Sequence, residues 1–483
     1  MILGHAARLS RERWRRENGY RQVLVIAIPL VLSMGSLAIT LFVDRMFLTW
    51  YSAEAVAASM PAGMLNFALM TLFIGTAGYT STFVAQYQGV GQDQRIGPAV
   101  WQGIYISLIG GAVLLALVPP AGAFFRFVGH EAAIRDNEIV YFRILCLGAV
   151  PAIASAAVAG FFSGRGRAWP VVWVNVLSTA INSVLDYALI FGHWGFPELG
   201  IRGAAIATVI ASSTQIIVYL ALLVGPEYNL RYRSLAGWRF ERALFVRLVR
   251  FGFPSGMQFF IDMIGFSIFV LFMGRLGTIP LAATNIVIGV STLAFLPMIG
   301  LGVAVSVLVG QSLGRNRADL AERSVYAGAH MAFTYMLTIA ALFVFAPDIF
   351  LRPFAAQADA QTFAEIRPIA IVALRFVAVF SLFDSLNIVF SAALKGAGDT
   401  RYIMFVVLLV SSATLVVPSY VALVVLGTDI VVGWSILTVY IIALTVVFLY
   451  RYLGGKWKSM RVIEEGFSGP TTPPLRQADA DGD

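Results

Sequence analysis

Four acidic side chains stand inside long apolar stretches of this sequence, where a charged group is costly. They are Asp44, Asp186, Asp262 and Asp384; the other 22 of the 26 Asp and Glu residues lie in loops, termini or the edges of apolar stretches. A carboxylate at the centre of a membrane-spanning helix costs about 2.5–3.5 kcal/mol on insertion scales, and such residues usually mark ion or substrate pathways. The four acids predict reversible binding of a proton, of Na⁺ or of a cationic ligand.

The acids of the first half of the chain could form one cluster. Asn182 lies one helical turn before Asp186, so its amide and the carboxylate share a face of the helix. Together with Asp44 they could bind a proton or Na⁺, because two carboxylates buried near each other disfavour ionisation of both. The alternative is local capping or pairing, which is most plausible for Asp44 because Arg45 follows it.

Asp262 and Asp384 belong to the second half of the chain and could meet there. They would either line a cavity that attracts cationic substrates or hold a second cation, and local pairing is again the alternative. Pro29 and Pro254 lie inside the first apolar stretch of each half. An internal proline frees a carbonyl and bends a helix, so each predicts either a hinge or a static kink.

The elements that must carry these residues are membrane-spanning helices. The chain of 483 residues is 59% hydrophobic and 12% charged, with a mean hydropathy of +0.81. Soluble domains are about 45–50% apolar and about 25% charged, so a soluble enzyme and a disordered protein are both excluded. Because a helix needs roughly 20 apolar residues to cross a bilayer, we predict an all-α polytopic membrane protein. Its twelve predicted spans are 22–48, 61–87, 99–120, 139–161, 170–192, 204–224, 246–273, 281–311, 325–346, 366–393, 402–425 and 430–452.

The basic residues predict how the chain is oriented. With the amino terminus in the cytoplasm, 25 of the 34 Lys and Arg residues fall on the cytoplasmic side and six on the other, which satisfies the positive-inside rule. We therefore attribute the net charge of +8 to topology and expect no nucleic-acid partner. Both termini are expected to be cytoplasmic. The predicted organisation is a basic amino terminus (1–20), a first lobe (21–225), a cytoplasmic linker (226–245), a second lobe (246–455) and a disordered cytoplasmic tail (456–483).

The two lobes are predicted to be copies of each other. A single offset of 225 residues aligns Pro29 with Pro254, and an offset of 232 aligns the glycines after the fourth and tenth spans. The other matches at these offsets are Ala57-Ala58 with Ala282-Ala283, Gly75 with Gly300, Ser81 with Ser306, Val84 with Val309, Gln86 with Gln311, Gly89 with Gly314, Gly164 with Gly396 and Gly166 with Gly398. Six spans per copy give both copies the same direction through the membrane. This is the parallel-repeat plan of many secondary transporters, which bind substrate between the halves.

Several cofactor classes find no support in the residues. Cys146 is the only cysteine and no Cys and His cluster offers a metal site, so we expect no structural metal and no disulfide within the chain. No Walker A pattern occurs, so ATP is not expected as a partner. The four histidines are scattered, which argues against a membrane-embedded enzyme.

At this point the sequence resembles the multidrug and toxic compound extrusion (MATE) family of efflux transporters, NorM and DinF-like members included. The resemblance covers roughly residues 20–455. The residues that carry it are Pro29 with Asp44, Ala57-Ala58, Val84-Ala85-Gln86 with Gly89, Gly164-Arg165-Gly166, Asn182-Ser183-Val184-Leu185-Asp186, Leu199-Gly200-Ile201-Arg202-Gly203-Ala204-Ala205 and Leu394-Lys395-Gly396-Ala397-Gly398-Asp399-Thr400.

The resemblance implies a secondary antiporter that exports amphipathic, often cationic, organic compounds in exchange for H⁺ or Na⁺. It implies an amino-lobe cation site at Asp44, Asn182 and Asp186. The NorM-like branch also has acids at positions matching Asp262 and Asp384, although it usually has Glu where this chain has Asp262. The expected location is a bacterial inner (plasma) membrane, and a monomer is expected. The partners are the lipid bilayer and small organic substrates.

Three other functions remain as alternatives. A flippase for lipid-linked saccharides shares the repeat plan, but it would be expected to hold several intramembrane arginines, and only Arg143 and Arg375 qualify here. A membrane-embedded enzyme would need a convergent His, Asp or Ser constellation. A channel would pass its substrate without an ion gradient.

Overall fold

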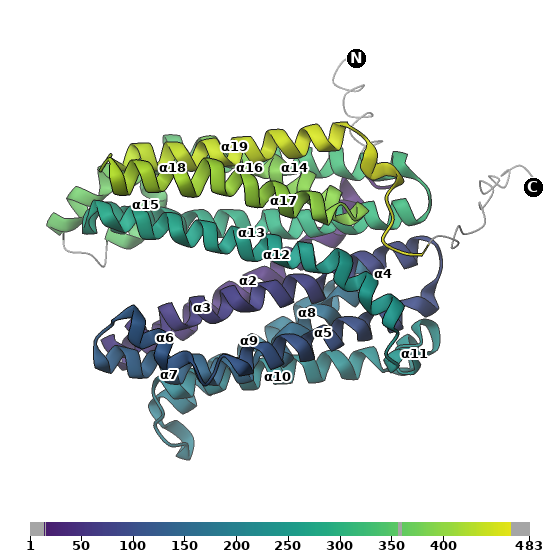
Figure 1. Cartoon of the computed structure of the whole chain (residues 1–483), viewed down its shortest axis with the longest axis horizontal. Coiled ribbons are helices and arrows are strands. Elements are labelled where there is room, and N and C mark those ends of the chain that lie inside the picture. The colour runs from purple at the N-terminus through teal and green to yellow at the C-terminus, as the bar shows by residue number, and fades with distance from the viewer. Residues whose placement is uncertain (1–13, 15, 356–359, 465–483) are drawn as a thin grey trace, which may run out of the picture.

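The computed structural model describes residues 14, 16–355 and 360–464, and within them every regular element is helical (Figure 1). Eleven helices, or twelve with one bent pair counted as a single span, are long and apolar enough to cross a membrane. They match the twelve predicted spans in order. Their bounds are α2 (Tyr20–Tyr51), α3 (Ala53–Gly78) with α4 (Thr80–Gly89), α5 (Ile96–Ala116), α7 (Ala132–Leu147) with α8 (Ala149–Gly164), α9 (Trp169–Phe191), α10 (Ile201–Leu223), α12 (Arg242–Met273), α13 (Thr278–Gly314), α14 (Ala318–Phe345), α16 (Ala360–Ala397), α17 (Thr400–Val410) continuing as π-helical turns to Val425, and α19 (Ile430–Leu453).

The fourth span differs most from its prediction. It consists of α7 and α8, which meet at Gly148 with a bend of 46°. It also begins at Ala132 rather than at residue 139, because the polar residues of the first two turns of α7 are helical although they are not apolar. Short helices α6 (Ala121–Val128), α11 (Pro226–Tyr232) and α15 (Asp348–Ala355) lie in the connections between spans.

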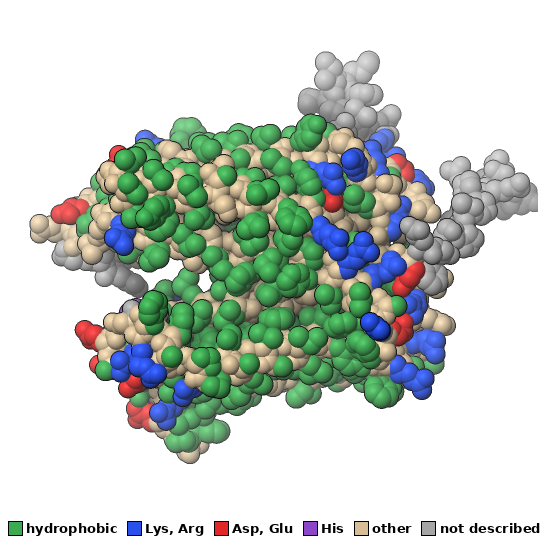
Figure 2. Space-filling view, viewed as in Figure 1, with side chains coloured by type: hydrophobic (Ala, Val, Ile, Leu, Met, Phe, Trp, Pro, Cys, Tyr) green, Lys and Arg blue, Asp and Glu red, His purple; other side chains and the backbone are tan. Residues whose placement is uncertain are grey.

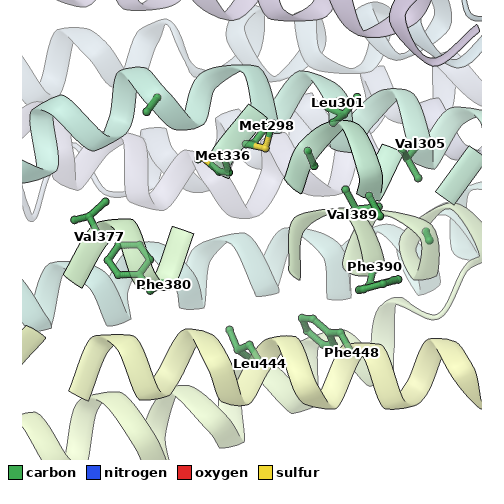
Figure 3. Packing of buried hydrophobic residues seen from close by; sticks show 14 of the residues in the cluster. Met298, Leu301, Val305, Met336, Val377, Phe380, Val389, Phe390, Leu444 and Phe448 are labelled. Atoms are coloured by element: carbon green, nitrogen blue, oxygen red, sulfur yellow. The ribbon is translucent and has the colours of Figure 1, made fainter. Parts of the chain in front are cut away.

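The buried apolar residues form two clusters, one for each half of the chain. One cluster runs from Leu48 to Leu248 and the other is formed mainly by residues 269–457. Figure 3 shows the second cluster, with Met298 and Leu301 of α13 facing Met336 of α14, and Phe380, Phe390 and Phe448 filling the space between α16 and α19. The first turns of α2 join the second cluster through Val23, Ile26 and Leu30, so the first helix packs across the boundary between the lobes.

The internal repeat is visible in how the lobes touch. A Cβ atom on Gly75 of α3 would lie 2.6 Å from Gly256 Cα of α12, and a Cβ on Gly300 of α13 would lie 2.9 Å from Val31 N of α2. Gly75 and Gly300 are related by the offset of 225, and so are Val31 and Gly256. The first helix of each half therefore packs on the second span of the other half, and the missing glycine side chain lets the backbones approach.

One end of the molecule is closed by the same symmetry. We call it the basic end, because arginines and lysines gather there in Figure 2 and because α2 begins and α19 ends there. Gln86 Nε2 donates a hydrogen bond to Gly396 O at 3.0 Å, and the repeat-related Gln311 Nε2 donates to Gly164 O at 2.9 Å. A Cβ on Gly89 would lie 2.9 Å from Gly314 Cα, so α4 and α13 cross backbone to backbone. At the opposite, distal end a hollow separates the lobes (Figure 2).

The predicted disordered tail is wrong for its first nine residues. Residues 456–464, called here the C-terminal strap, pack against both lobes. Trp457 is fully buried in the second-lobe cluster, and Val462 and Ile463 are buried in the first-lobe cluster. These apolar side chains explain the order, since the proline- and aspartate-rich composition begins only near residue 470. Residues 465–483, like 1–13, 15 and 356–359, lie outside the described residues.

The predicted linker between the lobes is also packed onto the basic end. Arg231 of α11 pairs with Asp93 at 2.6 Å, and Arg95 pairs with Glu241 at 2.9 Å. A Cβ on Gly237 would lie 2.6 Å from Pro98 N at the start of α5. The linker is therefore held against the first lobe.

Candidate functional site

Asp44, Asn182 and Asp186 come together inside the first lobe. Asp186 is fully buried, Asn182 is 1% exposed and Asp44 is 9% exposed. When the Asn182 amide is oriented to match its neighbours, its nitrogen donates to Asp44 Oδ1 at 2.8 Å and to Asp186 Oδ2 at 3.3 Å. Arg45 is exposed whereas Asp44 is buried, so the two adjacent side chains point apart. The alternative of a local Asp44–Arg45 pair therefore does not describe the geometry.

The two carboxyl groups of this cluster also form a hydrogen bond with each other. A hydrogen bond between two carboxyl groups requires that one of them carry a proton. Asp186 Oδ1 has no hydrogen-bond partner, and a buried oxygen left unpaired costs free energy. Tyr141 of α7, 7% exposed, lies close enough to interact electrostatically with both acids. The cluster can thus hold a proton, and its free oxygen is available to a cation.

The acid cluster lies at the end of a column of polar groups between α2 and α9. Thr40 and Thr179 hydroxyls are 2.8 Å apart, and Thr179 also donates to Ser36 O at 3.2 Å. Closer to the basic end, Asn175 donates to Ser33 and accepts a hydrogen bond from Gln215 at 2.6 Å. We did not single out these residues from the sequence. The signal was present, because Ser33, Ser36, Thr40 and Asp44, and likewise Asn175, Thr179, Asn182 and Asp186, recur at helical spacing within apolar segments.

Asp262 and Asp384 line a cavity of about 660 Å³ between the lobes. Most of its wall belongs to the second lobe, and α3 and α4 supply the rest. Gln258 and Tyr440 donate hydrogen bonds to Asp262, the latter at 3.5 Å, and Asn387 donates to Asp384 at 2.9 Å. Neither Asp44 nor Asp186 lines this cavity. The structure therefore separates the four acids into a buried cluster and a cavity pair.

Lys395 also lines this cavity and interacts electrostatically with Asp262. Counting hydropathy placed Lys395 in a loop after the tenth span, but α16 continues to Ala397 and keeps the residue inside the protein. The cavity thus holds two acids and one basic side chain among its described lining residues. A fifth acid was missed as well: Glu138 of α7 is fully buried and accepts a hydrogen bond from His130 at 2.8 Å.

Pro29 and Pro254 are buried inside α2 and α12, and both helices continue through them. Each proline lies two residues before the position where its helix touches the other lobe, Val31 for α2 and Gly256 for α12. The prolines therefore stand at the interface between the lobes, where a change in helix direction would change how the lobes approach.

Two repeated lobes, closed at one end and open at the other around a cavity lined by acids, define a secondary transporter of the parallel-repeat type. The chain belongs to the MatE family, whose model matches residues 29–188 and 254–421, one stretch in each half. It is therefore a multi-pass membrane transporter and not an enzyme, as the sequence predicted.

Curated relatives agree with this assignment. The chain is 28% identical over 388 residues to a protein of Bradyrhizobium diazoefficiens named as a probable multidrug resistance protein NorM, covering 79% of this chain and 81% of that protein. A Thermotoga maritima protein of the same name is 23% identical over 450 residues, covering 92% of this chain and 94% of its own length.

Solved structures show the same fold. A multidrug resistance MATE family transporter of the MOP superfamily in an outward-facing conformation superposes with a TM-score of 0.81 at 20% identity, covering 93% of this chain and 98% of the other. A MOP superfamily transporter from Pyrococcus furiosus, described by a binding pocket of reverse polarity, gives a TM-score of 0.81 at 21% identity, covering 92% and 98%.

Proposed function

We propose that this protein is a cation-coupled antiporter that exports amphipathic, cationic organic compounds. The coupling ion is H⁺ or Na⁺, bound at Asp44, Asn182 and Asp186. Relatives named as probable multidrug resistance proteins support the efflux part of the proposal. No other cofactor and no ATP enter this mechanism, and a monomer suffices because both repeats lie in one chain.

The observation that carries the proposal is the separation of the two acidic sites. One is a dry cluster with a shared proton and an unpaired oxygen, and the other is a cavity wide enough for an organic molecule. A buried carboxylate gains from binding a cation because neutralisation removes its desolvation cost. Phe259, Phe266 and Phe295 in the cavity wall offer flat apolar faces, which suit an aromatic cation.

Alternating access follows from the repeat. The hydrogen bonds of Gln86 and Gln311 hold the basic end closed while the distal end is open. Export requires the opposite arrangement, in which these bonds break and the cavity opens toward the basic end. A cation bound at the first-lobe cluster would shift the balance between the two arrangements only by binding one of them more tightly.

We further propose that the protein lies in a bacterial inner membrane with its basic end in the cytoplasm. The gathering of Lys and Arg at that end supports this orientation. In this orientation the open distal end faces the periplasm, as expected for a transporter after release of its substrate.

The test is transport in proteoliposomes that contain the purified full chain. A pH gradient and a Na⁺ gradient are imposed separately, and movement of ethidium is followed in each case. Ethidium movement driven by one gradient and abolished by dissipating it supports the antiporter and names the ion. Passive ethidium flux without any gradient would overturn coupling and favour a channel.

The flippase remains the alternative outcome of this test. Its support is limited to the shared repeat plan and to Lys395, the one basic side chain among the described residues that line the cavity. Transfer of a lipid-linked saccharide between leaflets, with no ethidium transport under either gradient, would replace the antiporter proposal.

A further inference from the structure

A second, basic cavity lies at the basic end on the seam between the two lobes. It has a volume of about 390 Å³. The first lobe supplies the start of α2 and the connection between α8 and α9, and the second lobe supplies the last turns of α13. The proposed transport mechanism uses none of its side chains except Gln311.

Four arginines line this cavity: Arg16 and Arg21 at the start of α2, Arg165 after α8, and Arg315 after α13. No acidic side chain is among its described lining residues. The nearest acid on record is Glu17, which pairs with Arg315 at 3.2 Å while both side chains remain about half exposed. Four positive charges around one small cavity repel each other unless an anion joins them.

Arg165 is 7% exposed and is held rigidly at the edge of this cavity. Its guanidinium carbon lies 4.0 Å from the centre of the Phe161 ring and 4.6 Å from that of Tyr228. Its Nε donates to Phe161 O at 3.2 Å, but its buried Nη2 has no hydrogen-bond partner. The aromatic rings stabilise the cation, and no acid is recorded as its ion-pair partner.

The internal repeat shows what fills the equivalent place on the other side of the molecule. Gly166 with Ile26 and Gln311 corresponds, at the offsets of 232 and 225, to Gly398 with Phe251 and Gln86. Both glycines have positive φ, +73° and +108°. A Cβ on Gly166 would meet Ile26 at 3.3 Å, and a Cβ on Gly398 would meet Phe251 at 3.6 Å. The two places are thus equivalent in structure as well as in sequence.

The place beside Gly398 is occupied by the C-terminal strap. Val462 would lie 2.8 Å from a Cβ on Gly398, and its backbone N donates to Gln86 Oε1 at 2.8 Å. Two residues on, the carboxylate of Glu464 accepts hydrogen bonds from Tyr87 at 2.7 Å and from Arg95 at 3.3 Å. On that side the chain supplies its own anion to a basic residue at the seam. On the Gly166 side the equivalent place is the basic cavity.

We propose that the basic cavity binds a phosphate-type anion, and that its source is the headgroup of an anionic phospholipid. Val25 lines the cavity and is exposed on α2, and Trp169 and Trp173 are exposed on the first turns of α9. Exposed tryptophans at helix ends lie at the level of lipid headgroups, so a lipid phosphate is near this cavity whereas a soluble anion must diffuse to it. Arginine suits this ligand because its planar fork binds phosphate oxygens in pairs.

The anion would hold the lobes together, because Arg21 and Arg165 belong to the first lobe and Arg315 belongs to the second. It would complement Gln311, whose hydrogen bond crosses the seam at the same place. Binding therefore favours the arrangement in which the basic end is closed.

The test measures lipid binding, not transport, so its failure is distinct from failure of the antiporter. The purified full chain in detergent is titrated with phosphatidylglycerol, with phosphatidylcholine and with inorganic phosphate, and bound lipid is counted by native mass spectrometry. We expect affinity for phosphatidylglycerol to exceed that for phosphatidylcholine by about tenfold, since each basic residue near an anionic headgroup contributes roughly fivefold. Equal affinity for the two lipids overturns the proposal.

Variants locate the site. Replacing Arg21 and Arg315 together with Gln should lower the affinity for phosphatidylglycerol by about tenfold or more, whereas R317Q should not change it. Arg317 is the matched control because it lies two residues from Arg315, pairs with Asp319 at 2.9 Å and does not line the cavity. If the double variant does not fold, the single variants R21Q and R315Q take its place. Unchanged affinity in the double variant, or in both single variants, overturns the site. Competition by millimolar inorganic phosphate would support phosphate recognition but assign a soluble source.

Discussion

Asn182 is the residue that joins the first-lobe acids into one site. Its single amide nitrogen reaches a carboxylate oxygen of Asp44 on α2 and one of Asp186, on its own helix α9. An amide can donate to both oxygens only while they stay on the same side of it. The positions of the three side chains therefore depend on one another, and a change in the charge of one acid is transmitted to the packing of α2 against α9.

We predict that D44N and D186N each lower gradient-driven substrate movement by about tenfold or more. Both substitutions keep the shape of the side chain but remove the group that gains and loses the cation. The measurement is ethidium transport in proteoliposomes, with the thermal midpoint as a test of folding. The control is D348N, which removes an exposed acid paired with Arg367 at 2.8 Å and should transport normally. Full transport by D44N would contradict the first-lobe cation site.

Lys395 gives a second prediction, on the charge of the cavity. We expect K395M to bind monovalent organic cations about tenfold more tightly, because it removes a positive charge that interacts with Asp262. Tenfold corresponds to about 1.4 kcal/mol, which is modest for two charges at an effective dielectric constant of 20. Equilibrium binding of a fluorescent cation measures the change, and K395R serves as the control that keeps the charge. Weaker cation binding by K395M would show that Lys395 does not oppose the ligand.

At this scale the sequence predicts best where residue type and hydropathy disagree. Each of the four acids it singled out is half-buried or buried, and three of the predicted site residues form one cluster. It failed for Lys395 and Glu138, because both lie near the ends of apolar stretches and helix ends cannot be located from hydropathy alone. It also could not place Asp262 and Asp384 in a cavity, since that depends on the distance between helices.

At the scale of elements, the close crossings of paired helices control the basic end. α4 and α13 cross at Gly89 and Gly314, whose Cα atoms would each lie within about 3.0 Å of a Cβ added to the other. The residues at such a crossing can only be glycine unless the lobes move apart. The offset of 225 residues predicted that these glycines are equivalent. It did not predict that they touch, because an alignment of a chain with itself carries no information on which copies face each other.

We predict that G89A destabilises the closed basic end. Its new methyl group would meet backbone atoms of Gly314 and Gln311, which cannot rotate away, and such overpacking typically costs about 1–3 kcal/mol. The expected results are a lower thermal midpoint and, in spin-label distance measurements, a larger separation between the lobes at the basic end. The control is G35A in the middle of α2, where nothing lies within 4 Å of the added atom and the substitution should be neutral or stabilising. An unchanged distance distribution in G89A would contradict this role.

For the whole molecule, the C-terminal strap couples the two lobes after the last span. Trp457 belongs to the core of the second lobe, while Val462 and Ile463 belong to the core of the first. Arg247 donates to Val462 O at 3.3 Å, and Lys458 pairs with Glu322 of α14. The sequence could not predict this arrangement, because nine residues with three buried apolar side chains are too short for a periodic pattern. Opening the basic end requires the strap to leave one lobe.

The strap should respond to acid through Glu464. Burial alone would raise the pKa of Glu464, but the hydrogen bond from Tyr87 and the charge of Arg95 hold it below its usual value of 4.5. Since the pKa is lower in the docked state, the carboxylate stabilises docking fully above about pH 4.5, and this contribution is lost as the pH falls through the docked-state pKa. A spin label at Ser459, introduced as S459C with C146S, reports the mobility of the strap. We expect an immobile label from pH 8 down to about 5, increasing mobility below about pH 4, and a mobile label at every pH in E464Q. The D348N variant, which alters an acid of α15 away from the strap, should follow the parent chain, and an immobile label in E464Q at pH 7 would mean that the apolar side chains alone hold the strap.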